Sequence, residues 1–175
     1  ATVIAGTKVI SDAGKSTITV PEIKAGAAAL ITIDKPQETG VRQLAIAVKN
    51  TVRNITVVIS KVAAPNVPQP ADRIFSYLQI DKVNMTDADV STVTIDFQVD
   101  KTWLNANRID KASVALNRFA GNAWAKLETK QIGETETHSV YRTESPGLSV
   151  FAITGKELPV AATPAATSQA TPAAI

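Results

Sequence analysis

The sequence predicts a mainly β protein, built as two small antiparallel β-sandwich-like lobes with one short helix near residues 101–107. Two observations predict this fold class. Apolar and polar residues alternate in short runs along much of the chain, as in strands that bury one face. Turn signals rich in Gly, Pro, Asn and Asp separate the runs roughly every eight to twelve residues, a spacing typical of antiparallel sandwiches.

The first predicted lobe covers residues 1–62. Residues 2–5 and 8–10 are short and apolar, and alternating segments follow at 17–20, 29–33, 44–48 and 55–59. Turn signals lie between them at residues 12–15, 24–26 and 35–40. Each segment has the length and pattern of a half-buried strand, so we expect an N-terminal β lobe.

Residues 63–70 form a predicted linker between the lobes. The segment contains Pro65, Pro68 and Pro70. Proline has no backbone N–H and fixes φ, so neither a helix nor a central strand is expected here. We expect a semi-rigid spacer and place the domain boundary at this segment.

The second predicted lobe covers residues 71–156 and contains the clearest strand. Val93, Ile95, Phe97 and Val99 alternate with polar residues, which predicts one buried and one polar face. Asp100 is the expected N-cap of the short helix. Further strands are expected at residues 74–80, 113–119, 124–127, 137–143 and 149–153, and the Ala/Thr/Pro-rich tail of residues 157–175 is expected to be disordered or extended in isolation.

Composition excludes several classes of protein. The 175 residues carry a formal net charge of +2, with no basic run interleaved with aromatic residues, so no nucleic-acid partner is expected. The chain has no Cys, which excludes disulfides and thiolate chemistry. It has no apolar run long enough for a membrane helix and no visible signal peptide, and its first residue, Ala1, suggests a processed or truncated chain.

Catalytic and cofactor motifs are not apparent, and we expect neither an enzyme nor a cofactor. His138 is the only histidine, and a catalytic role would need a nucleophile and an orienting carboxylate beside it. The adjacent Ser139 is expected on the opposite face of a strand. The more economical interpretation is a surface histidine.

Two other groups of residues have both a functional and a structural interpretation. Oxygen-rich side chains at 81–89 could bind calcium, but their spacing differs from a calcium loop, and turn formation and capping explain them without a metal. Trp103 and Trp124 could form a carbohydrate platform, although both lie in apolar patterns that favour burial. The oxygen-rich group at 81–89 consists of Asp81, Asn84, Asp87 and Asp89.

Two N-glycosylation motifs are present, at Asn54 and at Asn84. Asn54 is out of phase with the apolar residues that follow it, so its side chain is expected to face solvent. Asn84 lies in a predicted turn. Both are therefore candidate sites for covalent glycans, with an exposed strand residue and a turn residue as the structural alternatives.

One set of motifs consists of Lys82, Asn84, Thr86 to Asp89, Trp103, Leu104, Asn107, Ile109, Asp110, Ser113 to Leu116, Pro146 and Gly147, and residues 20–26 and 48–52 fit the same pattern. These motifs resemble the PGF-pre-PGF domain, a family of exported archaeal surface proteins, and the resemblance covers nearly the whole chain up to about Thr154. The resemblance implies an extracellular location at the cell surface, often in association with an S-layer, and a setting in which N-glycosylation is common. Leu148 departs from the pattern, since the family usually has Phe after Pro-Gly.

The expected function is that of a non-catalytic structural protein, a subunit of a filament, sheath or S-layer whose partners are copies of itself. Edge strands are templates for pairing, so the subunits are expected to be joined by β-strand addition. The candidate donor segment consists of Thr2, Val3, Ile4 and Ala5. A stalk-presented adhesin or carbohydrate-binding module is the alternative.

Overall fold

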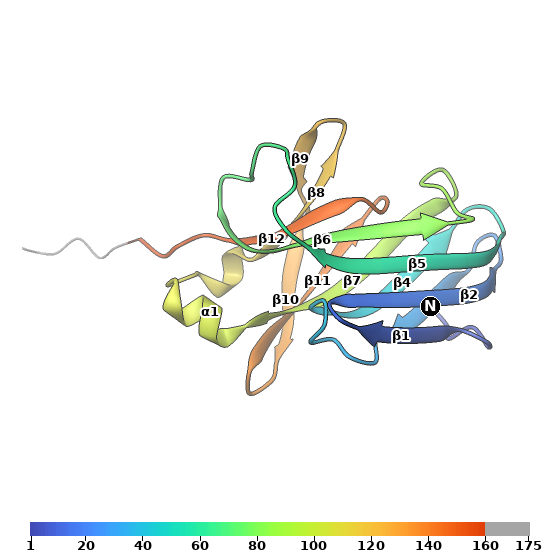
Figure 1. Ribbon diagram of the computed structural model, residues 1–175, viewed down its shortest axis with the longest axis horizontal. Coiled ribbons are helices and arrows are strands. Elements are labelled where there is room, and N and C mark those ends of the chain that lie inside the picture. Colours follow the sequence, from blue (N-terminus) through green and yellow to red (C-terminus); the bar gives the residue numbers. More distant parts are fainter. Residues whose placement is uncertain (160–175) are drawn as a thin grey trace, which may run out of the picture.

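The computed structural model describes residues 1–159 and confirms a mainly β architecture of two antiparallel sheets (Figure 1). The seven-stranded sheet has the order β1-β2-β5-β6-β12-β8-β9, and the five-stranded sheet has the order β10-β11-β7-β4-β3. Most of the predicted tail, residues 160–175, lies outside the described residues.

The elements follow one another along the chain with short connections. The strands are β1 (Lys8–Asp12), β2 (Lys15–Ile23), β3 (Ala28–Thr32), β4 (Val41–Val48), β5 (Val52–Val62), β6 (Arg73–Val83), β7 (Val90–Asp100), β8 (Ala115–Ala120), β9 (Ala123–Lys126), β10 (Thr129–Glu134), β11 (His138–Ser145) and β12 (Val150–Gly155). The helix α1 (Lys101–Ala106) and the 3-10 turn η1 (Lys111–Ser113) follow β7.

One hydrophobic core lies between the inner faces of the sheets. The predicted alternation of β7 is confirmed, because Val93, Ile95, Phe97 and Val99 are all at most 1% exposed. Ile18 of β2 is equally buried on the opposite sheet. A period of two along each strand therefore supplies the apolar face that the other sheet covers.

The sheets correct the predicted division into separate lobes. Strand β5 pairs with β6 across the linker, and β4 pairs with β7, so each sheet contains strands from both 1–62 and 71–156. Residues 63–70 connect two neighbouring strands. The linker is also attached to the sandwich, because the Trp124 Nε1–H donates a hydrogen bond to the Pro68 carbonyl.

The short helix is confirmed with Asp100 at its N-cap position, but the expected side-chain capping bond is absent. The Asp100 side chain makes no capping hydrogen bond, and its carboxylate instead lies 3.0 Å from Nε2 of His138. Leu104 is buried under the sandwich, and the ring of Trp103 packs on Phe75 with a centroid distance of 5.0 Å. Apolar contact, not capping, holds this helix in place.

Two further expectations for strands are corrected. Residues 129–134 form β10, which the sequence does not predict, because all its residues except Thr129 are exposed and the irregularity between Gln131 and Gly133 interrupts the register. Residues 2–5 were expected as a strand, but only Thr2 pairs, in an isolated parallel bridge to Ala29. Both segments lie at sheet edges, where one face has no core to pattern it.

Two buried tyrosines differ in how their hydroxyl groups are satisfied. Tyr141 stacks on Phe97 with a centroid distance of 5.5 Å, and its hydroxyl donates to the Lys111 carbonyl at 3.0 Å. Burial raises the pKa of Tyr141 to about 12. Tyr77 is 6% exposed, and among residues 1–159 its hydroxyl has no hydrogen-bond partner.

Replacing each tyrosine by Phe gives opposite expectations. Tyr141→Phe loses a buried hydrogen bond, which costs about 1 kcal/mol of the free energy of unfolding. Tyr77→Phe removes an unpaired buried hydroxyl and is expected to be neutral or stabilising. Urea unfolding of both variants at pH 7 measures the difference, and equal losses would contradict the hydrogen-bond assignment.

The buried hydroxyl of Tyr141 also predicts how the free energy of unfolding depends on pH. The raised pKa of Tyr141 means that its stabilising contribution is intact below pH 10, the ordinary pKa of a phenol, and is lost as pH rises toward about 12. We therefore expect Tyr141→Phe to flatten the alkaline fall in stability between these values. Denaturant titrations from pH 8 to about pH 12 test it, with the wild-type chain as control.

Candidate functional site

The conspicuous polar cluster joins residues that are far apart in the sequence but belong to the motifs described above. Asp87 accepts from Lys82 Nζ at 2.9 Å, from Arg118 Nη2 at 3.0 Å and from the Leu148 amide at 3.2 Å. These partners come from β6, β8 and the loop before β12. The carboxylate thus ties three separate segments at one end of the sandwich.

The chemistry of this cluster favours a charged carboxylate. Partial burial alone would raise the pKa of Asp87, but the Lys82 and Leu148 hydrogen bonds and the nearby positive charges outweigh burial and lower it below 3.8. A carboxylate so held is a poor general acid near neutral pH because it has no proton to donate, and a weak general base because its lowered pKa means a low affinity for protons. The cluster therefore fits a structural clamp.

Gly147 explains the Pro-Gly element of the motif. A Cβ atom on Gly147 would lie 2.7 Å from the Asp87 carboxyl group and 2.8 Å from Arg118 Nη2. Only a residue without a side chain lets the loop approach the clamp this closely. The following Leu148 is 3% exposed, so the departure from Phe falls at a core position.

The members of the oxygen-rich group at 81–89 make separate hydrogen bonds with different neighbours. Asp89 accepts from the amide and hydroxyl of Thr86, at 3.0 and 3.1 Å, and from Asn50 Nδ2 at 3.0 Å. Asp81 accepts from Gln79. Within residues 1–159 no set of three His, Asp or Glu side chains converges on one point, and the bonds between Asp89 and Thr86 are those of a turn.

The two candidate glycosylation sites lie side by side. Asn54 and Asn84 are both exposed and both have positive φ, 52° and 64°, a conformation that Asn tolerates well. Asn84 Nδ2 donates to the Asn54 carbonyl at 2.8 Å. Glycans on both residues would therefore project from one small area, where the beginning of β5 meets the end of β6.

His138 lies between a carboxylate and a hydroxyl group. Its Nε2 is 3.0 Å from Asp100, and its Nδ1 is 2.7 Å from Oγ1 of the preceding Thr137. The order carboxylate, imidazole, hydroxyl is that of a catalytic triad. His138 also borders a cavity of about 240 Å³ with Lys61, Ser76 and Gln98 among its other lining residues.

The backbone around Thr137 argues against acyl transfer there. An oxyanion hole needs nearby N–H groups that are not already engaged. The amides of Thr137 and His138 both donate to Thr135 Oγ1, at 3.3 and 3.0 Å. Lys101 donates its amide to the Thr137 carbonyl at 2.9 Å, so these contacts attach the tip of the β10–β11 hairpin to the start of α1.

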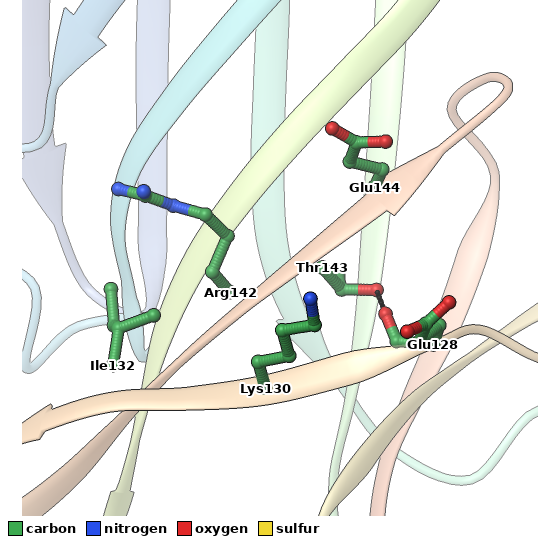
Figure 2. A pocket seen from close by; sticks show the side chains of 6 residues that line it. All are labelled: Glu128, Lys130, Ile132, Arg142, Thr143 and Glu144. Atoms are coloured by element: carbon green, nitrogen blue, oxygen red, sulfur yellow. Dashed lines mark hydrogen bonds between the residues drawn. The ribbon is translucent and has the colours of Figure 1, made fainter.

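A shallow trough of about 540 Å³ lies on the outer face of β10 and β11 (Figure 2). Its walls are partly polar and partly apolar, and the Thr143 hydroxyl donates to the Glu128 carbonyl at 2.7 Å. The Arg142 guanidinium is held by both oxygens of Asp96, at 2.7 and 2.8 Å, which raises the pKa of Arg142. The lining residues are Glu128, Lys130, Ile132, Arg142, Thr143 and Glu144.

The tryptophans do not line this trough. Trp103 is half-buried against Phe75, and Trp124 is half-buried between Tyr77 and Phe119, with centroid distances of 6.2 and 5.1 Å. A sugar-stacking platform needs an open aromatic face. Their packing weakens the carbohydrate-binding alternative.

The candidate subunit-contact residues cross from one sheet to the other. Thr2 bridges to β3 of the five-stranded sheet, whereas the following strand β1 belongs to the seven-stranded sheet. Ile4 packs partly against the core, and Val3 is 71% exposed. The segment is thus a mostly apolar connection between the sheets, and its hydrogen bonds to β3 are made by Thr2.

The clamp predicts a measurable effect from a small substitution. Gly147→Ala pushes a methyl group against the ends of the Asp87 and Arg118 side chains, which must move aside and weaken their ion pair, so we expect a loss of about 1 kcal/mol in the free energy of unfolding. Gly133→Ala is the matched control, since no atom lies within 4 Å of its Cβ position. Chemical denaturation measures both, and equal stability of the two variants would contradict the clamp.

The His138 arrangement predicts a local effect. His138→Ala removes the bond to Asp100, so we expect several-fold faster hydrogen exchange at the Lys101 amide with the core unchanged. Thr137→Val is the control, because it keeps the Asp100 contact. A hydrolytic activity of the wild-type chain that both variants abolish would show instead that the three groups are a catalytic unit.

Comparison with known proteins gives no identification. No model of a known protein family matches the chain, and no curated protein matches it. Among residues 1–159, no helix has the length and hydrophobicity to cross a bilayer. The relation to the PGF-pre-PGF domain therefore stays a prediction based on the motif residues.

Proposed function

We propose that this protein is a non-catalytic structural subunit of an extracellular assembly on an archaeal cell surface, such as a filament, a sheath or an S-layer. Its partners are further copies of the same chain, joined by β-strand addition. The archaeal surface comes from the motif resemblance. The mode of joining comes from the edges of the sheets.

The observation that carries the proposal is the weak attachment of the N-terminal segment. Thr2 makes the segment's only bridge to a sheet within residues 1–159, and Val3 is largely exposed. A segment that is uncharged in its side chains, apolar and attached by one bridge can leave its own sandwich at small cost. Apolar strands with unsatisfied backbone groups readily pair with another sheet.

The remaining sites agree with a scaffold. The Asp87 clamp and the hairpin contacts of His138 support loops, and the two tryptophans pack against neighbouring aromatic rings. Asn54 and Asn84 are proposed glycan sites, and both are exposed. The trough on β10 and β11 is the place where a carbohydrate-binding module would bind its ligand, but it lacks an aromatic wall.

Deleting residues 1–6 tests the proposal. We expect the full chain to form ordered polymers at high concentration and the deletion variant to remain monomeric, because the donor segment is gone. Negative-stain electron microscopy and sedimentation velocity measure the assemblies. Circular dichroism checks that the deletion variant is folded.

Ile10→Ser is the matched control. Ile10 is 69% exposed, close to the value for Val3, but it lies on β1 and outside the donor segment. This variant is expected to polymerise like the full chain. Polymers formed by the deletion variant, or none formed by the full chain, would refute the proposal.

A further inference from the structure

The four edge strands of the sandwich are not alike. Strands β1 and β9 end the seven-stranded sheet, and β10 and β3 end the five-stranded sheet. Charged side chains protect three of them: Lys8 and Asp12 on β1, Lys126 on β9, and Lys130 and Glu134 on β10. Strand β3, with the sequence AALIT, carries no charge and no proline, the two devices that usually block edge pairing.

The N-terminal segment covers only the beginning of this edge. The Thr2 amide donates to the Ala28 carbonyl at 3.0 Å, and the Leu30 amide donates to the Thr2 carbonyl at 2.8 Å. In a continued parallel ladder, Ile4 would next pair with the Leu30 carbonyl and the Thr32 amide. Within residues 1–159, neither group has a backbone partner on this edge.

A turn prevents the segment from pairing further within its own chain. The Ile4 carbonyl accepts from the Thr7 amide at 3.1 Å, and Gly6 has a φ of 85° that favours glycine. This turn redirects the chain into β1, which belongs to the opposite sheet. The hydrogen bond to Thr7 therefore replaces the one that Ile4 would make to Thr32.

We propose that the outer edge of β3 is the acceptor for residues 2–5 of a second copy. The register already present in the chain would be kept, with Thr2 opposite Ala29, and the ladder would continue so that Ile4 lies opposite Ile31. The turn at residues 4–7 acts as the hinge, and its opening lets the exchanged segment satisfy Leu30 and Thr32. This inference rests on the proposed function, because it names the partner edge for the same donor segment.

The geometry is head-to-tail, which decides what kind of assembly results. The donor segment and the acceptor edge are different surfaces of one chain, so each copy can give a segment to one neighbour and receive one from another. Such an interface extends without limit unless the rotation happens to close a ring. A filament needs no second contact type.

Mixed single-cysteine chains test the acceptor edge, and the absence of natural cysteine makes the readout clean. In the proposed register Val3 lies opposite Leu30 on the outer face, at a spacing that a disulfide can bridge. Val3→Cys and Leu30→Cys chains, mixed and oxidised, are expected to give at least about ten-fold more mixed dimer than a Val3→Cys and Ile10→Cys mixture, because pairing raises the local thiol concentration. Equal yields would overturn the inference.

A double variant separates this inference from the proposed function. Val3→Cys with Leu30→Cys in one chain locks the segment onto its own edge when oxidised, and we expect polymerisation to be lost and then restored by a reducing agent. Polymers from the locked chain would overturn β3 as acceptor while leaving a structural assembly in place. Failure of the reduced and the wild-type chains to assemble would refute the proposed function itself.

Discussion

Burial of one face of each sheet against the other is the interaction on which the rest of this structure depends. Ile18 and Phe151 of one sheet and Phe97 of the other are fully buried. Because strands from both halves of the sequence enter each sheet, the core cannot be divided at the proline-rich connection. A single core of this kind makes the sandwich one unit and confines the unsatisfied backbone groups to its four edges.

The polar clusters serve this arrangement. Asp87 gathers Lys82, Arg118 and the Leu148 amide at one end of the sandwich, where three connections meet. Lys82, Asp87 and Gly147, which are among the residues that resemble the family motif, therefore have a structural role in joining these segments. An ionised carboxylate with its hydrogen-bonding capacity used in this way has little left for chemistry.

The sequence predicts which residues face the core better than it predicts which strands pair. Alternation identified the inner face of β7 because side-chain direction follows from position along a strand. Pairing of β5 with β6 across the linker depends on long-range contact, and no local pattern encodes it. Strand β10 was not predicted because every residue in it except Thr129 is exposed, so no apolar face marks it in the sequence.

The candidate site shows the same division. The exposure of Asn54 and Asn84 and the turn at Thr86 follow from local chemistry and were predictable. The clamp on Asp87 and the contact between Asp100 and His138 join residues about 30 and 40 positions apart, and only the fold brings them together. The Asp100 carboxylate was expected to bond to an amide of α1, but it contacts His138 on the neighbouring strand instead.

The edge of β3 can pair with the N-terminal segment of its own chain or with that of a second copy. The subunit concentration decides which of the two is bound. Within one chain the N-terminal segment has the advantage of an effective concentration on the order of millimolar. An exchanged segment would make two further hydrogen bonds and lose the one from Thr7 to Ile4, a net gain of one bond worth about 1 kcal/mol, or roughly a five-fold preference. The two effects balance at a subunit concentration of roughly a few hundred micromolar, about one fifth of the effective concentration. Subunits crowded at a surface exceed that value more readily than subunits diluted in solution, so the same chain can remain closed while dispersed and become linked where it accumulates.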